Sequence, residues 1–390
     1  MFLCPKPRIP LYPVLGFQTP VPDSLIMARS SSVFSGDEVE LTANGRTSLA
    51  RGLTRLKLTP PFSVLAPAFH CIPMIEPIFW AGGKVIFYRL NKDLSVDLDD
   101  CKQKIQPDTK ALLAAHYFGF PQNTAELKNF CNTNGLFFIE DCAHAFFGSD
   151  TNTVALGATG DVAIASPWKF FPIQDGGCLI VRDGKIAPPL KSRGVRFEAK
   201  SFANALEIAH QYGRFPAASK PLDLLFAIKN FGLNSVSPPV TDSSVAPNEI
   251  GQLNPLQIDK RMSFFSRYTL RTSDARQIVN ARRLNYAHLL GLLQNAPGIQ
   301  PLFPAFPETA VPYVLPMVME QPARVFTPLK QRGIPILRFG EFRWPTLAPE
   351  ICDTSTELSR CVFQFPCHQS LKADEIEWMG REITATLNAT

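Results

Sequence analysis

The first half of the chain alternates short apolar runs with stretches in which apolar residues recur at helical spacing. The apolar runs predict strands and cover residues 64–66, 84–88, 111–116, 136–139, 162–165 and 178–181. One helical stretch begins near Asn44 or Gly45, and two others cover residues 98–105 and 124–133. Strands that alternate with helices form a mostly parallel sheet with right-handed crossovers and helices on its faces. We therefore expect an α/β fold.

The second half has longer helical stretches and fewer strands. Residues 200–231 and 262–293 predict long helices, and residues 235–255 predict a loop rich in Pro, Ser and Asn. The helix over 262–293 carries arginines that predict a solvated basic face: Arg267, Arg271, Arg276, Arg282 and Arg283. A strand over 313–319 and helices over 323–332 and 373–387 follow. We expect a large domain over 1–260, with an N-terminal arm, and a small α/β domain over 261–390.

An acid and an amine follow two neighbouring predicted strands. Asp141 comes directly after the run 136–139, and Lys169 lies three residues after Ser166, which ends the run 162–165. The carboxyl ends of parallel strands are where α/β sheets bind ligands. A lysine that forms a Schiff base and an aspartate that pairs with a pyridinium nitrogen suit pyridoxal phosphate chemistry. The alternative is that Asp141 caps a helix and Lys169 is an ordinary surface lysine.

Several blocks of the sequence, in order, resemble the DegT/DnrJ/EryC1/StrS family of sugar aminotransferases. These blocks are Gly45-Arg46-Thr47-Ser48-Leu49, Val64-Leu65-Ala66-Pro67-Ala68-Phe69, His116-Tyr117-Phe118-Gly119, Glu140-Asp141-Cys142-Ala143-His144, Ser166-x-x-Lys169 with Gly176-Gly177, and Phe365-Pro366-Cys367-His368-Gln369-Ser370-Leu371. The resemblance covers roughly residues 40 to 185 well, the last quarter moderately and residues 186 to 260 poorly. It implies an aspartate-aminotransferase-like fold of type I.

The resemblance also implies roles for single residues. It places the cofactor phosphate at the backbone of Arg46 and Thr47, where a helix start offers free N–H groups. Arg46 stands where the family often has threonine, and either adds a contact to phosphate or is solvated. His144 is expected at the ring hydroxyl or ring edge, and Ser166 beside the cofactor.

The ring that should stack on the cofactor departs from the family pattern. In the family an aromatic residue usually lies four positions after the proline of the loop, and here Cys71 occupies that position. A flat ring is needed to sandwich the cofactor, so His70 is the candidate and Phe69 the alternative. Phe69 is equally suited to a role in the core.

Composition excludes several other classes. The formal charge of +5 is mild and no Lys/Arg run accompanies it, so nucleic-acid binding is not indicated. No Gly-x-Gly-x-x-Gly follows a strand, which argues against a Rossmann site. The nine cysteines are spaced singly, which predicts reduced thiols, no metal site and a cytoplasmic location. The window 72–90 contains two prolines, a glutamate and a lysine, so no membrane span is expected, and residues 1–20 do not form a signal peptide.

The function expected from these patterns and the resemblance is a pyridoxal phosphate-dependent aminotransferase. The family implies glutamate as amino donor and a keto sugar linked to a nucleotide as acceptor, in polysaccharide or secondary-metabolite synthesis. The alternatives are another pyridoxal phosphate reaction, such as sugar dehydration, or a cofactor-binding regulator without catalysis. Lys169 argues against the dehydratases of the family, in which histidine replaces the lysine. No intrachain segment after residue 181 completes the phosphate pocket convincingly, since Gly232-Leu233-Asn234 fits poorly, so we expect a homodimer with sites near the subunit boundary.

Overall fold

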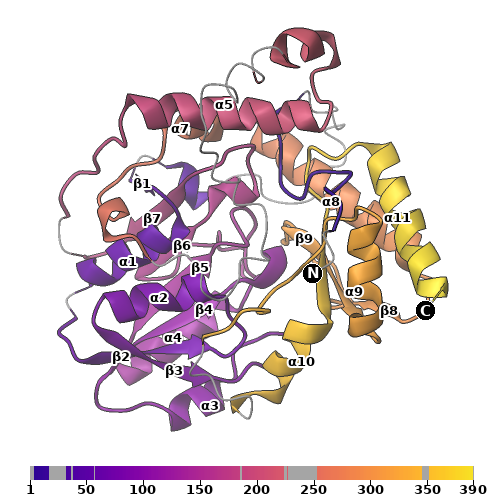
Figure 1. Cartoon of the computed structure of the whole chain (residues 1–390). Helices are drawn as coiled ribbons and strands as arrows, with labels where there is room; N and C mark the ends of the chain where they lie inside the picture. Colours follow the sequence, from indigo (N-terminus) through magenta and orange to yellow (C-terminus); the bar gives the residue numbers. More distant parts are fainter. Residues whose placement is uncertain are drawn as a thin grey trace.

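Two sheets with helices around them organise the protein, as the computed structural model in Figure 1 shows. The structure describes residues 4–16, 32–36, 38–56, 58–184, 187–223, 226, 253–344 and 351–389. The predicted loop over 235–255 and the segment Gly232-Leu233-Asn234 therefore fall largely outside the described residues. No helix among the described residues is long and apolar enough to cross a membrane.

The larger sheet has seven strands in the described part of the chain, in the order β1-β7-β6-β5-β4-β2-β3. These strands are β1 (Glu40–Thr42), β2 (Phe62–Pro67), β3 (Gly83–Tyr88), β4 (Thr109–Ala115), β5 (Phe137–Cys142), β6 (Val162–Ala165) and β7 (Gly177–Val181). The pairs from β3 to β6 are parallel, and β7 is antiparallel to both of its neighbours. The mostly parallel α/β sheet predicted from the sequence is confirmed.

Helices lie around this sheet (Figure 1). They are α1 (Gly45–Arg55), α2 (Ile72–Trp80), α3 (Leu98–Gln103), α4 (Thr124–Asn134) and α5 (Val195–Gln211). Helix α1 starts where its sequence predicts, because the Asn44 side chain accepts a hydrogen bond from the Thr47 amide at 2.9 Å. Helix α2 was not predicted, since Pro73 and Pro77 break its pattern; Pro73 lies in its first turn, where proline is tolerated.

The smaller sheet comes from the last third of the chain and is antiparallel, in the order β10-β11-β9-β8. Its strands are β8 (Ile299–Pro301), β9 (Val314–Met319), β10 (Leu337–Arg338) and β11 (Val362–Pro366). The accompanying helices are α7 (Phe264–Thr272), α8 (Ala275–Leu293), α9 (Pro322–Gln331), α10 (Asp353–Cys361) and α11 (Ala373–Asn388). Helix α11 packs on α8 and α9. The boundary near residue 260 stays a prediction.

The single helix predicted over 262–293 is wrong, because the chain breaks it into α7 and α8. Ser273 adopts an extended conformation, and the Asp274 carboxylate caps α8 by accepting hydrogen bonds from the amides of Arg276 and Gln277. The predicted solvated basic face is also wrong for Arg282, which is fully buried. The periodicity of the apolar residues continues across the break, so the sequence pattern alone does not reveal it.

Candidate active site

Asp141 and Lys169 lie at the carboxyl ends of adjacent parallel strands, as predicted. Asp141 is the fifth residue of β5 and pairs with Ile164 of β6, and Lys169 ends the short turn Pro167–Lys169 that follows β6. The Asp141 carboxylate accepts a hydrogen bond from the Ala143 amide at 2.8 Å and is 4% exposed. The two strands therefore bring an acid and an amine to one edge of the sheet.

The charges of these two groups are coupled through a buried environment. Burial raises the pKa of Asp141, and the Ala143 amide and the Lys169 charge oppose this rise. Burial lowers the pKa of Lys169, while Cys71 and Asp141 oppose the fall. A lowered pKa increases the fraction of neutral amine, which is the nucleophilic form. The Lys169 ammonium lies 5.6 Å and 5.3 Å from the ring centroids of Trp168 and Tyr313, respectively.

The start of α1 adjoins the Lys169 turn and carries an unused hydroxyl group. The Thr47 hydroxyl is buried and has no hydrogen-bond partner among the described residues. Gly45 approaches Ser166 so closely that a Cβ at Gly45 would lie 2.3 Å from the Ser166 hydroxyl oxygen. Gly177 is equally confined, because its added Cβ would lie 2.3 Å from the Asn44 carbonyl. Gly45 thus brings the start of α1 against the turn that bears Lys169, and Gly177 brings β7 against the residue that caps α1.

Arg46 does not extend into solvent but pairs with α2. Its Nε lies 3.2 Å from Oε2 of Glu76, and both side chains are mostly buried. The pair links the first turn of α1 to α2, whose N-cap is Cys71. Arg46 and Thr47 are therefore adjacent to the other predicted residues, and their contact with phosphate stays a prediction.

The structure places His70 in the core, in contrast to the expected stacking role. Its ring stacks on Phe87 with centroids 4.7 Å apart, its Nδ1 donates to the Pro67 carbonyl, and its Nε2 accepts from the Trp344 amide. Burial lowers the pKa of His70 to about 4. Both nitrogens and one ring face are thus engaged in the core. Phe69 is fully buried among other rings, which agrees with its core alternative.

Cys71, the residue after His70, is electrostatically coupled to the predicted active-site groups. Burial raises the pKa of its thiol, and the charges of Lys169, Asp141 and Arg46 all act on it.

His144 is packed between the rings of Tyr313, at 4.8 Å, and Phe118, at 5.7 Å. Burial and Lys169 lower the pKa of His144 well below its ordinary value, so its imidazole is neutral.

Two tyrosines that the sequence did not indicate also border Lys169. Tyr12 packs edge to face on Trp168 at 4.8 Å, and its hydroxyl is hydrogen-bonded to that of Tyr313. The segment around Tyr12 is held by the closing segment of the chain, since His368 donates to the Pro10 carbonyl and the Val14 amide donates to Ser370. No local pattern could have identified these tyrosines, because they are about 300 residues apart and meet only in the fold.

Arg282 connects the Lys169 turn to the smaller sheet. Its guanidinium donates to the carbonyls of Lys169 at 2.7 Å, Pro312 at 3.1 Å and Tyr313 at 3.1 Å, and to the Gln369 side chain at 3.0 Å. Burial lowers the pKa of Arg282 to about 10, and no carboxylate pairs with it among the described residues. Oxygen dipoles and the Phe170 ring, whose centroid lies 4.4 Å from the guanidinium carbon, therefore compensate this cation.

We expect Arg282→Met to destabilise the protein by about 2–4 kcal/mol, because it leaves four buried acceptors without a donor. Arg283→Met is the matched control. Arg283 lies next to it on α8 and donates to the carbonyls of Pro307, Glu308 and Ala310, but it is partly exposed. Its replacement should cost about 1 kcal/mol. Chemical denaturation measures both, and equal losses would contradict the central role of Arg282.

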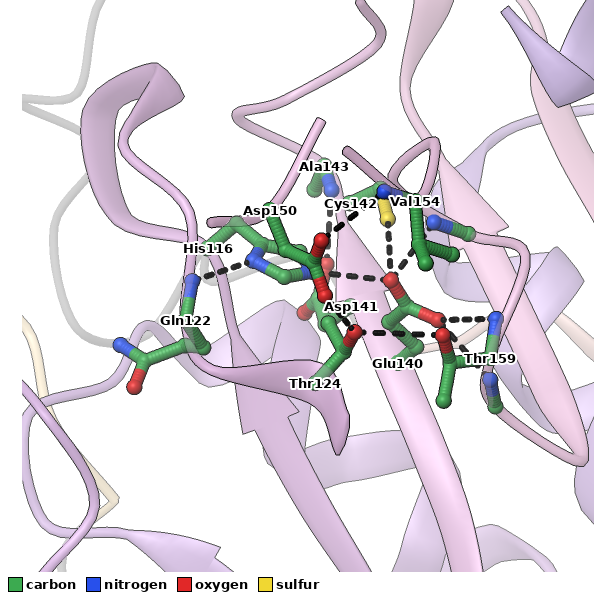
Figure 2. A network of polar contacts seen from close by, with 12 residues as sticks. His116, Gln122, Thr124, Glu140, Asp141, Cys142, Ala143, Asp150, Val154 and Thr159 are labelled. Carbon is green, nitrogen blue, oxygen red and sulfur yellow. Dashed lines mark hydrogen bonds and ion pairs between the residues drawn. The ribbon is translucent and has the colours of Figure 1, made fainter. Parts of the chain in front are cut away.

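A possible metal site among the described residues is already saturated by hydrogen bonds. Ligand atoms of His116, Glu140 and Cys142 lie within 4.8 Å of one another. However, the Gln122 amide donates to Nδ1 of His116 at 2.9 Å, and the other ring nitrogen donates to Glu140 at 3.0 Å. Backbone amides occupy the remaining sites on Glu140 (Figure 2). This group therefore serves the structure.

The relationship to known proteins agrees with this arrangement. Residues 34–206 match the DegT/DnrJ/EryC1/StrS aminotransferase family. The resemblance indicated by the motifs is thereby confirmed, and the matched segment contains both Asp141 and Lys169.

Among curated relatives, the protein is 30% identical over 159 residues to a GDP-perosamine synthase of Vibrio cholerae, covering 39% of this chain and 43% of the relative. It is 30% identical over 154 residues to a dTDP-4-dehydro-2,3,6-trideoxy-D-glucose 4-aminotransferase of Saccharopolyspora spinosa, covering 39% and 40%, respectively. The match thus spans about two fifths of the length of these relatives.

Solved structures extend the likeness to nearly the whole fold. A DegT DnrJ EryC1 StrS aminotransferase from Brucella abortus aligns with a TM-score of 0.62 at 17% identity, over 90% of this chain and 86% of that one. NtdA from Bacillus subtilis, solved with bound cofactor PMP, aligns with a TM-score of 0.59 at 16% identity, over 90% and 73%. These alignments confirm the predicted fold class.

Proposed function

We propose that this protein is a pyridoxal phosphate-dependent aminotransferase that transfers an amino group from glutamate to a keto sugar linked to a nucleotide. The observation that carries the proposal is the placement of Lys169 and the buried Asp141, which are electrostatically coupled, at the ends of adjacent parallel strands. The family match and the names of the curated relatives support the substrate class.

The residues present fit this cofactor. The first turn of α1, with the unpartnered Thr47 hydroxyl and the close approach at Gly45, offers donors for a phosphate. Lys169 would supply the amine that holds the aldehyde, and Asp141 would supply the carboxylate for the ring nitrogen. When bound, the cofactor provides an electron sink.

The chain's own groups then have distinct tasks. An ionised Asp141 keeps the ring nitrogen protonated, which strengthens the electron sink. Lys169, with its lowered pKa, is suited to remove a proton from the substrate and return it. The rings of Trp168 and Tyr313 and the neutral His144 exclude water around the amine. Ser166 and His144 are proposed to contact the cofactor.

A half-reaction screen tests the function. The holoprotein is mixed with glutamate, glutamine, aspartate or alanine, and the absorbance of the lysine-linked cofactor is followed. Loss of that absorbance with formation of the keto acid supports amino transfer. Linked cofactor that no donor converts would favour a regulator, and release of water from a sugar without amino transfer would favour a dehydratase.

The proposal includes a homodimer and a cytoplasmic enzyme of polysaccharide or secondary-metabolite synthesis. An exposed apolar face on α5 and α7 supports the dimer: Val195 is 85% exposed, Phe202 51%, Phe264 65% and Tyr268 59%. Exposed apolar patches of this kind mark interaction sites.

Phe264→Asp should therefore dissociate the dimer, because it places a charge in the apolar contact. Leu284→Asp is the control, as Leu284 is 40% exposed and belongs to α8, not to α5 or α7. Sedimentation at assay concentration measures both proteins. A wild type that is monomeric and active would overturn the shared site. A Phe264→Asp variant that remains dimeric would show that the interface lies on another surface.

A further inference from the structure

We propose that Glu140 is a positioning residue for the active site: its carboxylate holds the strand that carries Asp141 against the loop that leads to Lys169. This inference rests on the proposed function, because it assigns a task relative to these two residues. Glu140 precedes Asp141 on β5, and side chains alternate between the faces of a strand, so the two carboxylates point to opposite faces.

Glu140 is a fully buried carboxylate with four nitrogen donors. Oε1 accepts from Nε2 of His116 at 3.0 Å and the Gly157 amide at 2.6 Å, and Oε2 accepts from the amides of Thr159 at 3.2 Å and Gly160 at 2.9 Å (Figure 2). Burial alone would raise the pKa of Glu140, but His116 and the amides of Gly157 and Gly160 hold it below its ordinary value. The group is therefore an anion in the folded protein.

The loop bound by Glu140 leads directly into the strand before Lys169. Residues 157–160 precede β6, whose Ala163 and Ile164 pair with Glu140 and Asp141. Arg182, which directly follows β7, binds the other side of this loop, donating to the carbonyls of Gly160 and Gly157. The loop peptides thus lie between a carboxylate and a guanidinium, and their dipoles are aligned with both charges.

His116 fixes the same strand at two consecutive residues. Its amide donates to the Asp141 carbonyl at 3.1 Å, while its ring donates to the Glu140 carboxylate. Because the Gln122 amide donates to Nδ1, the ring proton lies on Nε2, where Glu140 accepts it. The His116 ring and the Glu140 carboxylate therefore fix the position of Asp141 along its strand relative to both β4 and β6.

Asp150 provides a matched comparison in the same region (Figure 2). It is also fully buried, and it accepts from the Thr124 hydroxyl at 2.6 Å and from the amides of Asn152 and Val154 at 2.9 Å. However, it binds a turn and the start of α4, and it reaches the loop bound by Glu140 only indirectly, because the Thr124 hydroxyl accepts from the Thr159 hydroxyl at 3.2 Å. Loss of Asp150 should affect stability without moving Asp141 relative to Lys169.

The experiment compares Glu140→Gln with Asp150→Asn in the holoprotein. Each amide keeps the shape of the carboxylate but turns one acceptor into a donor that opposes backbone N–H groups. The readouts are the pH midpoint of the absorbance of the lysine-linked cofactor, the single-turnover rate with the donor that wild type uses, and thermal unfolding. Because the reacting groups are misplaced, Glu140→Gln should have a shifted midpoint and a single-turnover rate about tenfold or more below that of wild type.

Both variants should unfold at lower temperature, but only Glu140→Gln should shift the midpoint. An unchanged midpoint and rate in folded Glu140→Gln, or an equal shift in Asp150→Asn, would overturn the inference. If Glu140→Gln does not fold, His116→Gln serves instead, since its amide still donates to Glu140 and it should give a smaller shift. A wild type that never links the cofactor would refute the proposed function itself, before any variant is compared.

Discussion

Lys169→Ala is expected to abolish covalent attachment of pyridoxal phosphate and to lower the rate of amino transfer by about a thousandfold or more. The side chain is the one amine that the described residues bring to the strand ends beside Asp141. Its removal takes away both the nucleophile that binds the aldehyde and the base that moves the proton. The neighbouring rings cannot replace either function.

Borohydride reduction of the wild-type holoprotein followed by peptide mapping should place the label on Lys169. Lys84→Ala is the control, because Lys84 is exposed on β3. It should keep the label, the colour and the rate of wild type. A label on any lysine other than Lys169 would reject the assignment, and so would a Lys169→Ala variant that still traps the cofactor with borohydride.

The parts of the site that sequence reasoning found are those determined by neighbours along the chain. A run of apolar residues predicts β5, and a second run predicts β6. Because the carboxyl ends of parallel strands meet at one edge of a sheet, Asp141 and the Lys169 turn could both be placed at that edge. The start of α1 was found because the Asn44 cap and Gly45 are a local signal.

The parts that were missed depend on contacts between distant segments. Arg282 has the sequence pattern of a surface arginine, yet it is buried because the carbonyls of Lys169, Pro312 and Tyr313 converge on it. His70 is a plausible stacking ring by composition, but the Trp344 amide, 274 residues away, satisfies its second nitrogen in the core. Neither partner can be read from local periodicity.

Asp141→Asn should slow the amino half-reaction by on the order of a hundredfold or more, while the protein still folds and binds the cofactor. The substitution keeps the volume of the side chain and removes the charge that would keep the cofactor nitrogen protonated. Stopped-flow measurement of the single-turnover rate tests this, with Asp150→Asn as the control for loss of a buried carboxylate nearby. A wild-type rate in Asp141→Asn would remove Asp141 from the cofactor ring.

The same substitution should leave two marks on the protein without cofactor. The Asp141 charge raises the pKa of Lys169, so its removal lets that pKa fall further, and the pH midpoint for linking added pyridoxal phosphate should move to lower pH.

Burial also raises the pKa of Asp141, so ionisation of this group costs folding free energy above the pKa that it has in the unfolded chain. Asparagine removes that cost. The variant should therefore unfold at the same or a higher temperature than wild type at neutral pH, and the gain should vanish as the pH falls to values where the carboxyl is protonated in both states. A clear loss of stability at neutral pH would mean that Asp141 supports the fold and is not held there for its charge.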